Sequence, residues 1–180
     1  MKILLATPLY PPEIAPVAQY VKELARRLKD IHEITILAYA YIPEQIPGVH
    51  IVTIQKDAFL PLRIIKYLTS LFSLEADIIY ALNGASIELP VGIFTYFRHT
   101  NLIYCIGDQN ALNHGKKSVL FRTIQRLLQK KAYAVIETIP SDRPEILPLE
   151  PRPDGALATW EQEWKKHIEE LNSIFTHVKH

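Results

Sequence analysis

Hydrophobic positions along this chain alternate between short continuous runs and stretches with helical spacing. Residues 2–7 form an apolar run that ends at a proline-rich loop, which is typical of a buried parallel strand. In residues 17–28, apolar side chains recur every three or four positions and charged ones fill the rest, which predicts an amphipathic helix. The alternation continues and predicts strands at 33–38, 49–54, 77–81, 101–106 and 133–138, with helices at 62–72, 86–97 and 117–131.

This order of strands and helices predicts the fold class. Parallel strands joined by right-handed crossovers form a doubly wound sheet with helices on both faces. We therefore predict a single Rossmann-like α/β domain with a mainly parallel sheet over residues 1–139. Pro90 falls inside the predicted helix at 86–97, where we expect it to be tolerated only in the first turn.

The alternation stops after the sixth predicted strand. Residues 140–155 contain five prolines in sixteen positions, which predicts an extended linker. A last helix is predicted at 156–177. Its apolar stripe should dock the helix back onto the sheet domain, and it consists of Trp160, Trp164, Ile168, Leu171 and Phe175.

Composition narrows the function classes. A length of 180 residues suits one domain, and a net charge of +1 gives no global field for nucleic acid. Cys105 is the only cysteine, so neither an internal disulfide nor a cysteine-rich metal site is expected. No stretch approaches the ~18 apolar residues that span a bilayer. We therefore expect a soluble, cytoplasmic protein, with any peripheral contact at the inner face of the membrane.

Candidate chemistry should lie in the loops that follow the strands. Ligands of open parallel sheets bind beyond the carboxyl ends of the strands. Here those loops are residues 8–16, 83–86 and 107–115. No glycine-rich phosphate loop follows a strand, so we expect no cofactor and no independent binding of a nucleotide-sugar.

Several segments, in order, resemble the N-terminal, acceptor-side domain of family 4 glycosyltransferases, which have the GT-B fold. They are KILLATPLYPPEIAPVAQYVKELARRL at 2–28, HEITILAY at 32–39, ADIIYALNG at 76–84, LIYCIGD at 102–108 and RTIQRLLQKKAYAVIETIPS at 122–141. TWEQEWKKHIEEL at 159–171 resembles the family's terminal helix, which crosses back onto that domain. The resemblance implies that the donor-binding domain, which lies between these parts in the family, is missing.

The resemblance also implies site residues. Asp108 would lie in the acceptor cleft, where it could orient an acceptor hydroxyl or act as a base; the alternative is that it caps a loop or helix. Two family glycines are replaced by Ala15 and Pro16, and a frequent histidine by Ile106. Candidate acceptor-binding residues are Glu13, Gln19, Asn83, Gly84, Gly107, Asn110 and His114.

One predicted helix is strongly basic. Six lysines and arginines and no acidic residue occur over residues 116–131, and those with a candidate role in membrane or anion contact are Lys116, Lys117, Arg122, Arg126 and Lys130. Such a helix either presents a solvated outer face or meets anionic lipid headgroups. No aromatic platform accompanies the charges, so we predict no nucleic-acid partner.

Two functions remain open. The first is the acceptor-side half of a split glycosyltransferase, inactive alone and completed by a separate donor-domain protein. The second is a non-catalytic binding or regulatory module that descends from a glycosyltransferase, which the changes at Ala15, Pro16 and Ile106 favour. A homodimer through the exposed cleft face is a further possibility for the partner.

Overall fold

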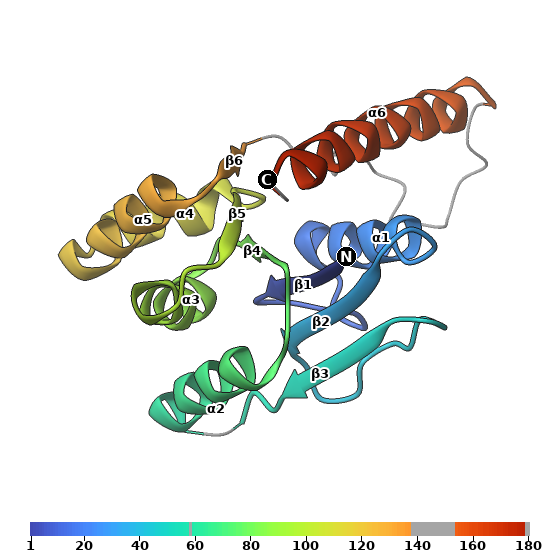
Figure 1. Cartoon of the computed structure of the whole chain (residues 1–180). Helices are drawn as coiled ribbons and strands as arrows, with labels where there is room; N and C mark the ends of the chain where they lie inside the picture. Colours follow the sequence, from blue (N-terminus) through green and yellow to red (C-terminus); the bar gives the residue numbers. More distant parts are fainter. Residues whose placement is uncertain (58, 138–153, 179–180) are drawn as a thin grey trace.

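The structure is a computed structural model that describes residues 1–57, 59–137 and 154–178. Its centre is a six-stranded sheet of order β3-β2-β1-β4-β5-β6 in which every neighbouring pair is parallel (Figure 1). The strands are β1 (Lys2–Thr7), β2 (Glu33–Tyr39), β3 (His50–Ile54), β4 (Ile78–Leu82), β5 (Asn101–Cys105) and β6 (Ala134–Ile136). The predicted fold class, a Rossmann-like parallel sheet, is confirmed.

Helices cover both faces of the sheet (Figure 1). One face carries α1 (Pro16–Leu28) and α6 (Asp154–Val178). The other carries α2 (Leu60–Ser73), α3 (Ala85–Phe97), α4 (Gln109–Lys116) and α5 (Val119–Lys131). Side chains of β1 alternate between the two cores, with Ile3 and Leu5 in the first and Leu4 and Ala6 in the second, as the period of a strand requires.

The chain changes faces between the two central strands. β1 and β4 are neighbours, with Ile3 opposite Ile78, but the helices that follow them lie on opposite faces. This is a topological switch point, the place in an open parallel sheet where ligands usually bind. The carboxyl ends of β1 and β4 therefore define the place where a ligand is expected.

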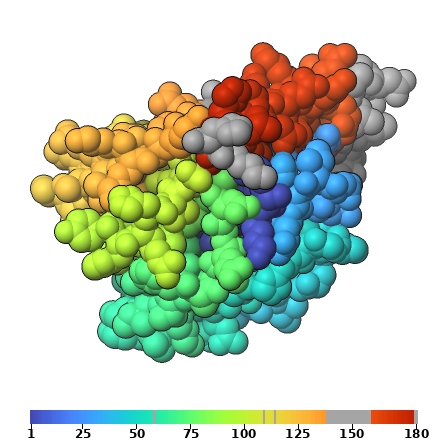
Figure 2. All heavy atoms as spheres, viewed as in Figure 1, coloured from blue at the N-terminus to red at the C-terminus, as the bar shows by residue number. Residues whose placement is uncertain are grey.

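The predicted docking of the last helix is confirmed. Trp164, Leu171 and Phe175 of α6 are buried in the core between the sheet and α1, and Trp160 and Ile168 are half-buried beside them. In the space-filling view, α6 lies directly against α1 (Figure 2). The helix begins at Asp154, so the last two residues of the predicted linker are helical; 140–153 lie outside the described residues.

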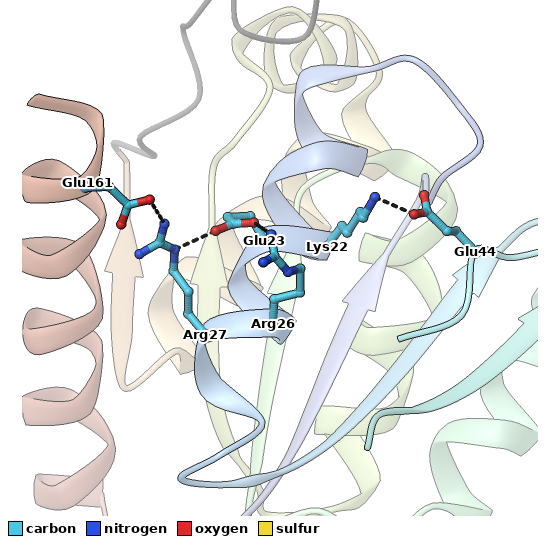
Figure 3. A network of polar contacts seen from close by, with 6 residues as sticks. All are labelled: Lys22, Glu23, Arg26, Arg27, Glu44 and Glu161. Carbon is cyan, nitrogen blue, oxygen red and sulfur yellow. Dashed lines mark hydrogen bonds and ion pairs between the residues drawn. The ribbon is translucent and has the colours of Figure 1, made fainter. Parts of the chain in front are cut away.

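Ion pairs extend the contact between α6 and α1 at the surface (Figure 3). Arg27 donates from Nη2 to Glu161 of α6 at 2.8 Å and from Nε to Glu23 at 2.7 Å. Its guanidinium also lies 5.2 Å from the ring centroids of Trp160 and Trp164. Arg27 thus joins the two helices by both charge and aromatic contact.

The basic region differs from its prediction. The expected loop 107–115 contains a helix, α4, and the expected helix 117–131 begins at Val119. Lys116 ends α4 and Lys117 lies between the two helices, so the six charges do not belong to one helix. The sequence hid α4 because it has little apolar periodicity: Leu112 is its one buried large apolar side chain.

Pro90 also lies deeper in its helix than expected. α3 begins at Ala85, so Pro90 falls in the second turn and cannot donate to the carbonyl of Ser86. The hydroxyl of Tyr39 donates to that carbonyl instead, at 3.3 Å. A side chain from a neighbouring strand therefore compensates for the proline, and no local sequence pattern reveals such a partner.

Candidate functional site

One side chain joins the ends of β4 and β5. Asn83 is buried directly after β4; its Nδ2 donates to the carbonyl of Asp108 at 2.6 Å, and its Oδ1 accepts from the Asp108 N–H at 2.9 Å. The Asn83 N–H donates to the carbonyl of Cys105 at 2.8 Å. Asn83 thereby fixes the loop that carries Gly107 and Asp108, and its contact with an acceptor stays a prediction.

Asp108 begins α4 as its N-terminal cap. Its Oδ1 accepts from the backbone N–H groups of Asn110 at 2.8 Å and Ala111 at 3.0 Å. This is the capping interpretation that the sequence left open. The cap holds the half-buried carboxylate at the carboxyl edge of the sheet, and a catalytic role for it stays a prediction.

Gly84 brings the loops of the two central strands together. Gly84 stands immediately before α3 with a φ of +149°, and a Cβ at this position would lie 3.2 Å from Cγ of Pro8. A side chain would be strained by both the backbone angle and the close approach. The loops after β1 and β4 therefore touch at the switch point, and glycine permits the contact.

A buried carboxyl group lies close to the switch point, in the first turn of α3. Glu88 is 1% exposed and accepts from the Tyr104 hydroxyl at 2.6 Å and from Nε2 of Gln125 at 3.2 Å. The Gly84 N–H donates to the same oxygen at 3.4 Å. Burial and the neighbouring Glu88 raise the pKa of Tyr104 well above its ordinary value, which keeps its hydroxyl a donor. No local sequence pattern predicts this network, because its members come from separate elements.

A second charged group lies at the ends of β2 and β3. Glu13, in the loop after β1, forms an ion pair with Lys56, which follows β3. The guanidinium of Arg63, in the first turns of α2, lies 4.8 Å from the ring centroid of Tyr39. The sequence prediction included Glu13 but missed Lys56, close behind the predicted strand at 49–54, and Arg63, at the start of the predicted helix at 62–72.

The remaining predicted acceptor residues are spread along the edge. Gln19 is half-buried in the first turn of α1, and Gly107 is half-buried beside Asp108. Asn110 is exposed in α4, which also contains His114, whose side chain is outside the described residues. Only Asn83 and Asp108, with the glycines beside them, are brought together after β4 and β5, whereas Glu13 pairs with Lys56 beyond β3.

The predicted basic residues form an exposed surface over the end of α4 and the length of α5. Lys116, Lys117, Arg122, Arg126 and Lys130 are all exposed. Arg122 donates from Nε and Nη2 to the carbonyl of Lys116, at 3.0 and 2.7 Å, which ties the two helices together. α5 (orange) lies at the outer surface of the molecule (Figure 2).

The described part of the chain contains neither a metal-binding cluster nor a membrane-spanning helix. None of its histidine, cysteine, aspartate and glutamate side chains come together in a group of three or more that could hold a metal ion. Within the same residues, every helix is too short or too polar to cross a bilayer.

Comparison with known proteins gives a distant structural likeness. No protein-family model matches the chain, and no curated protein matches it. Among solved structures, it is similar to a protein from Listeria monocytogenes described as a UDP-N-acetylglucosamine 2-epimerase, with 15% identity and a TM-score of 0.47. The match covers 74% of this chain but only 37% of that one. A likeness this distant identifies neither a family nor an activity.

Proposed function

We propose that this domain is the acceptor-side half of a GT-B-type glycosyltransferase, which works with a donor-binding domain outside these 180 residues. The resemblance of its segments to family 4 enzymes supports the proposal, as do the polar residues Asn83 and Asp108 at the carboxyl edge of the sheet. Transfer in such an enzyme needs the donor to be enclosed between two domains. The isolated domain should therefore neither transfer sugar nor hydrolyse a sugar donor.

The observation that carries this proposal is an apolar rim at the carboxyl edge of the sheet. Ile14, Ile42 and Phe59 follow β1, β2 and β3, and they are 83%, 81% and 76% exposed. We infer that these three side chains, each of which follows a strand at the carboxyl edge, belong to one interaction site. A donor-binding domain that closes over this edge would bury them and complete the cleft.

Capture of the partner tests the proposal. The tagged full chain would be incubated with an extract of the source organism, and bound proteins identified by mass spectrometry; a donor-domain protein is expected. Ile42→Glu should abolish its capture, because a charge at the rim opposes burial. Ile31→Glu is the matched control, since Ile31 is also exposed but lies at the opposite edge, before β2. Equal capture by both variants would contradict this placement.

The competing function is a non-catalytic binding or regulatory module. It is favoured by Ala15 and Pro16, which replace the glycines usual in the family, and by the use of Asp108 as a helix cap. Under this alternative, a captured partner would contain no donor-binding domain. A homodimer through the same rim would instead appear as a doubled mass in light scattering, which Ile42→Glu would reduce to that of the monomer.

Peripheral membrane contact belongs to the same proposal. Val119 and Leu120 at the start of α5 are 76% and 59% exposed, and Lys117 and Arg122 are exposed beside them in the sequence. Apolar side chains flanked by basic ones suit the headgroup region of an anionic bilayer. Such contact would bring the domain to a lipid-linked acceptor.

A further inference from the structure

The guanidinium of Arg63 has unsatisfied hydrogen-bonding capacity. It lies over the ring of Tyr39, and its Nε is buried without a hydrogen-bond partner. Among the described residues, no carboxylate forms an ion pair with it. A buried donor left unpaired in the folded protein is unfavourable, so the arrangement suits a ligand that supplies an acceptor.

Lys56 adds a second positive charge beside Arg63. Burial and the positive charge of Arg63 lower the pKa of Lys56 below its ordinary value. Lys56 follows β3 and Arg63 lies in the first turns of α2, the next helix along the chain, and the carboxylate of Glu13 pairs with Lys56. Asp57 is adjacent in the sequence and exposed. Within this group, the charge of Arg63 is the one left without a counter-ion.

The position of Lys56 and Arg63 in the fold also favours the binding of an anion. Tyr39 connects Arg63 to the carbonyl of Ser86, in the first turn of α3. Tyr39 thus links the guanidinium to the N-terminal turn of a helix, the end that carries a partial positive charge. Because Glu13 belongs to the loop after β1, its ion pair with Lys56 lies at the carboxyl edge of the sheet, where the acceptor is proposed to bind.

We propose that Lys56 and Arg63 bind a phosphate monoester group of the acceptor. The planar guanidinium can donate two parallel hydrogen bonds to phosphate oxygens, with Tyr39 fixing its plane, and Lys56 supplies a point charge. Glu13 competes with the phosphate for Lys56, so the loop after β1 would release Lys56 when the ligand binds. The phosphate could come from a soluble sugar phosphate or from a lipid headgroup. The assignment to an acceptor rests on the proposed function, whereas the anion site itself does not.

Calorimetric titration of the full chain with glucose 1-phosphate and inorganic phosphate tests the site, with unphosphorylated glucose as the ligand control. We expect saturable binding of the phosphates and none of glucose. Arg63→Gln should weaken binding roughly tenfold or more, because it removes charge-assisted hydrogen bonds, and Arg63→Lys should weaken it less. Lys66→Gln, a change at an exposed lysine of the same helix, should leave affinity unchanged. Glu13→Gln should bind phosphate more tightly, a gain that a purely structural role for this residue would not produce.

Vesicles that contain phosphatidic acid separate the two sources of phosphate. Arg63-dependent binding to soluble phosphates supports a soluble acceptor, and Arg63-dependent binding to vesicles alone supports a lipid headgroup. The proposed site is contradicted if neither the soluble phosphates nor the vesicles bind the wild type. It is also contradicted if both bind the Arg63→Gln variant as tightly as the wild type, once circular dichroism has shown that the variant is folded. Phosphate binding without sugar transfer by the completed enzyme would contradict the proposed function and support the phosphate site. Sugar transfer without phosphate binding would support the proposed function and contradict the phosphate site.

Discussion

The hydroxyl of Tyr20 on α1 and Nε2 of His167 on α6 lie 2.8 Å apart inside the protein, although the residues are 147 positions apart in the sequence. The same hydroxyl lies 2.7 Å from that of Tyr80 on β4, so a polar chain runs from α6 into the sheet. Trp164 stacks on the Tyr20 ring with centroids 5.5 Å apart. The last helix is therefore held by a defined polar contact as well as by apolar burial.

This contact predicts sensitivity to acid. Burial lowers the pKa of His167, against the opposing effect of Glu170. The unfolded chain binds the proton near pH 6.5, so acid favours the unfolded state. The stability contributed by neutral His167 should be fully present above that pH and decline as the pH falls toward the lowered folded-state pKa. Urea unfolding at a series of pH values would measure it.

His167→Gln should remove this part of the pH dependence. The amide can keep a hydrogen bond to Tyr20 but does not titrate. His50→Gln is the control, because His50 is exposed at the start of β3. If His167→Gln and the wild type lose the same free energy of unfolding between neutral and acidic pH, the buried histidine is not the cause.

The two tryptophans of α6 should differ in their contribution to stability. Trp164 is 2% exposed, and its replacement by alanine should lower the free energy of unfolding by about 3–5 kcal/mol. Trp160 is only half-buried, so Trp160→Ala should lower it less. Urea denaturation of both variants makes the comparison. Similar losses would show that the burial of Trp164 does not dominate the docking of α6.

The sequence predicted the docked helix and the sheet for a shared reason. Both rest on the arrangement of apolar positions, a continuous run at residues 2–7 and a stripe at helical spacing along α6. It missed α4, whose polar sequence has little periodicity, and it could not foresee that Tyr39 would compensate for Pro90. The ion pair of Glu13 with Lys56 was also out of reach, because it joins loops that only the sheet order brings together.

Asp108 allows the capping and catalytic roles to be separated. Asparagine caps helices as well as aspartate does, so Asp108→Asn should leave the free energy of unfolding nearly unchanged, whereas Asp108→Ala should lower it by about 1 kcal/mol. Asparagine cannot accept a proton as a base. If Asp108 has that role, Asp108→Asn should reduce sugar transfer by the completed enzyme at least ~100-fold. Undiminished transfer would leave Asp108 as a cap only.

Membrane contact through α5 should depend on charge. Arg122→Glu combined with Arg126→Glu should weaken binding to phosphatidylglycerol vesicles roughly tenfold or more, since each basic residue near the surface contributes about 1 kcal/mol. Added salt should weaken wild-type binding as well. Sedimentation with vesicles would measure both effects. The matched control replaces Lys165 and Lys166, two exposed lysines of α6, by glutamate, which reverses the same number of charges. Equal losses in the two double variants would contradict a specific role for α5.

Sugar transfer by the completed enzyme tests the central claim most directly. A labelled sugar donor and an acceptor extract would be given to the chain alone, to the captured donor-domain protein alone, and to their mixture. We predict transfer only by the mixture, and its loss with Ile42→Glu but not with Ile31→Glu. Turnover by the purified chain alone, or an inactive mixture in which the two proteins are fully bound to each other, would contradict the claim.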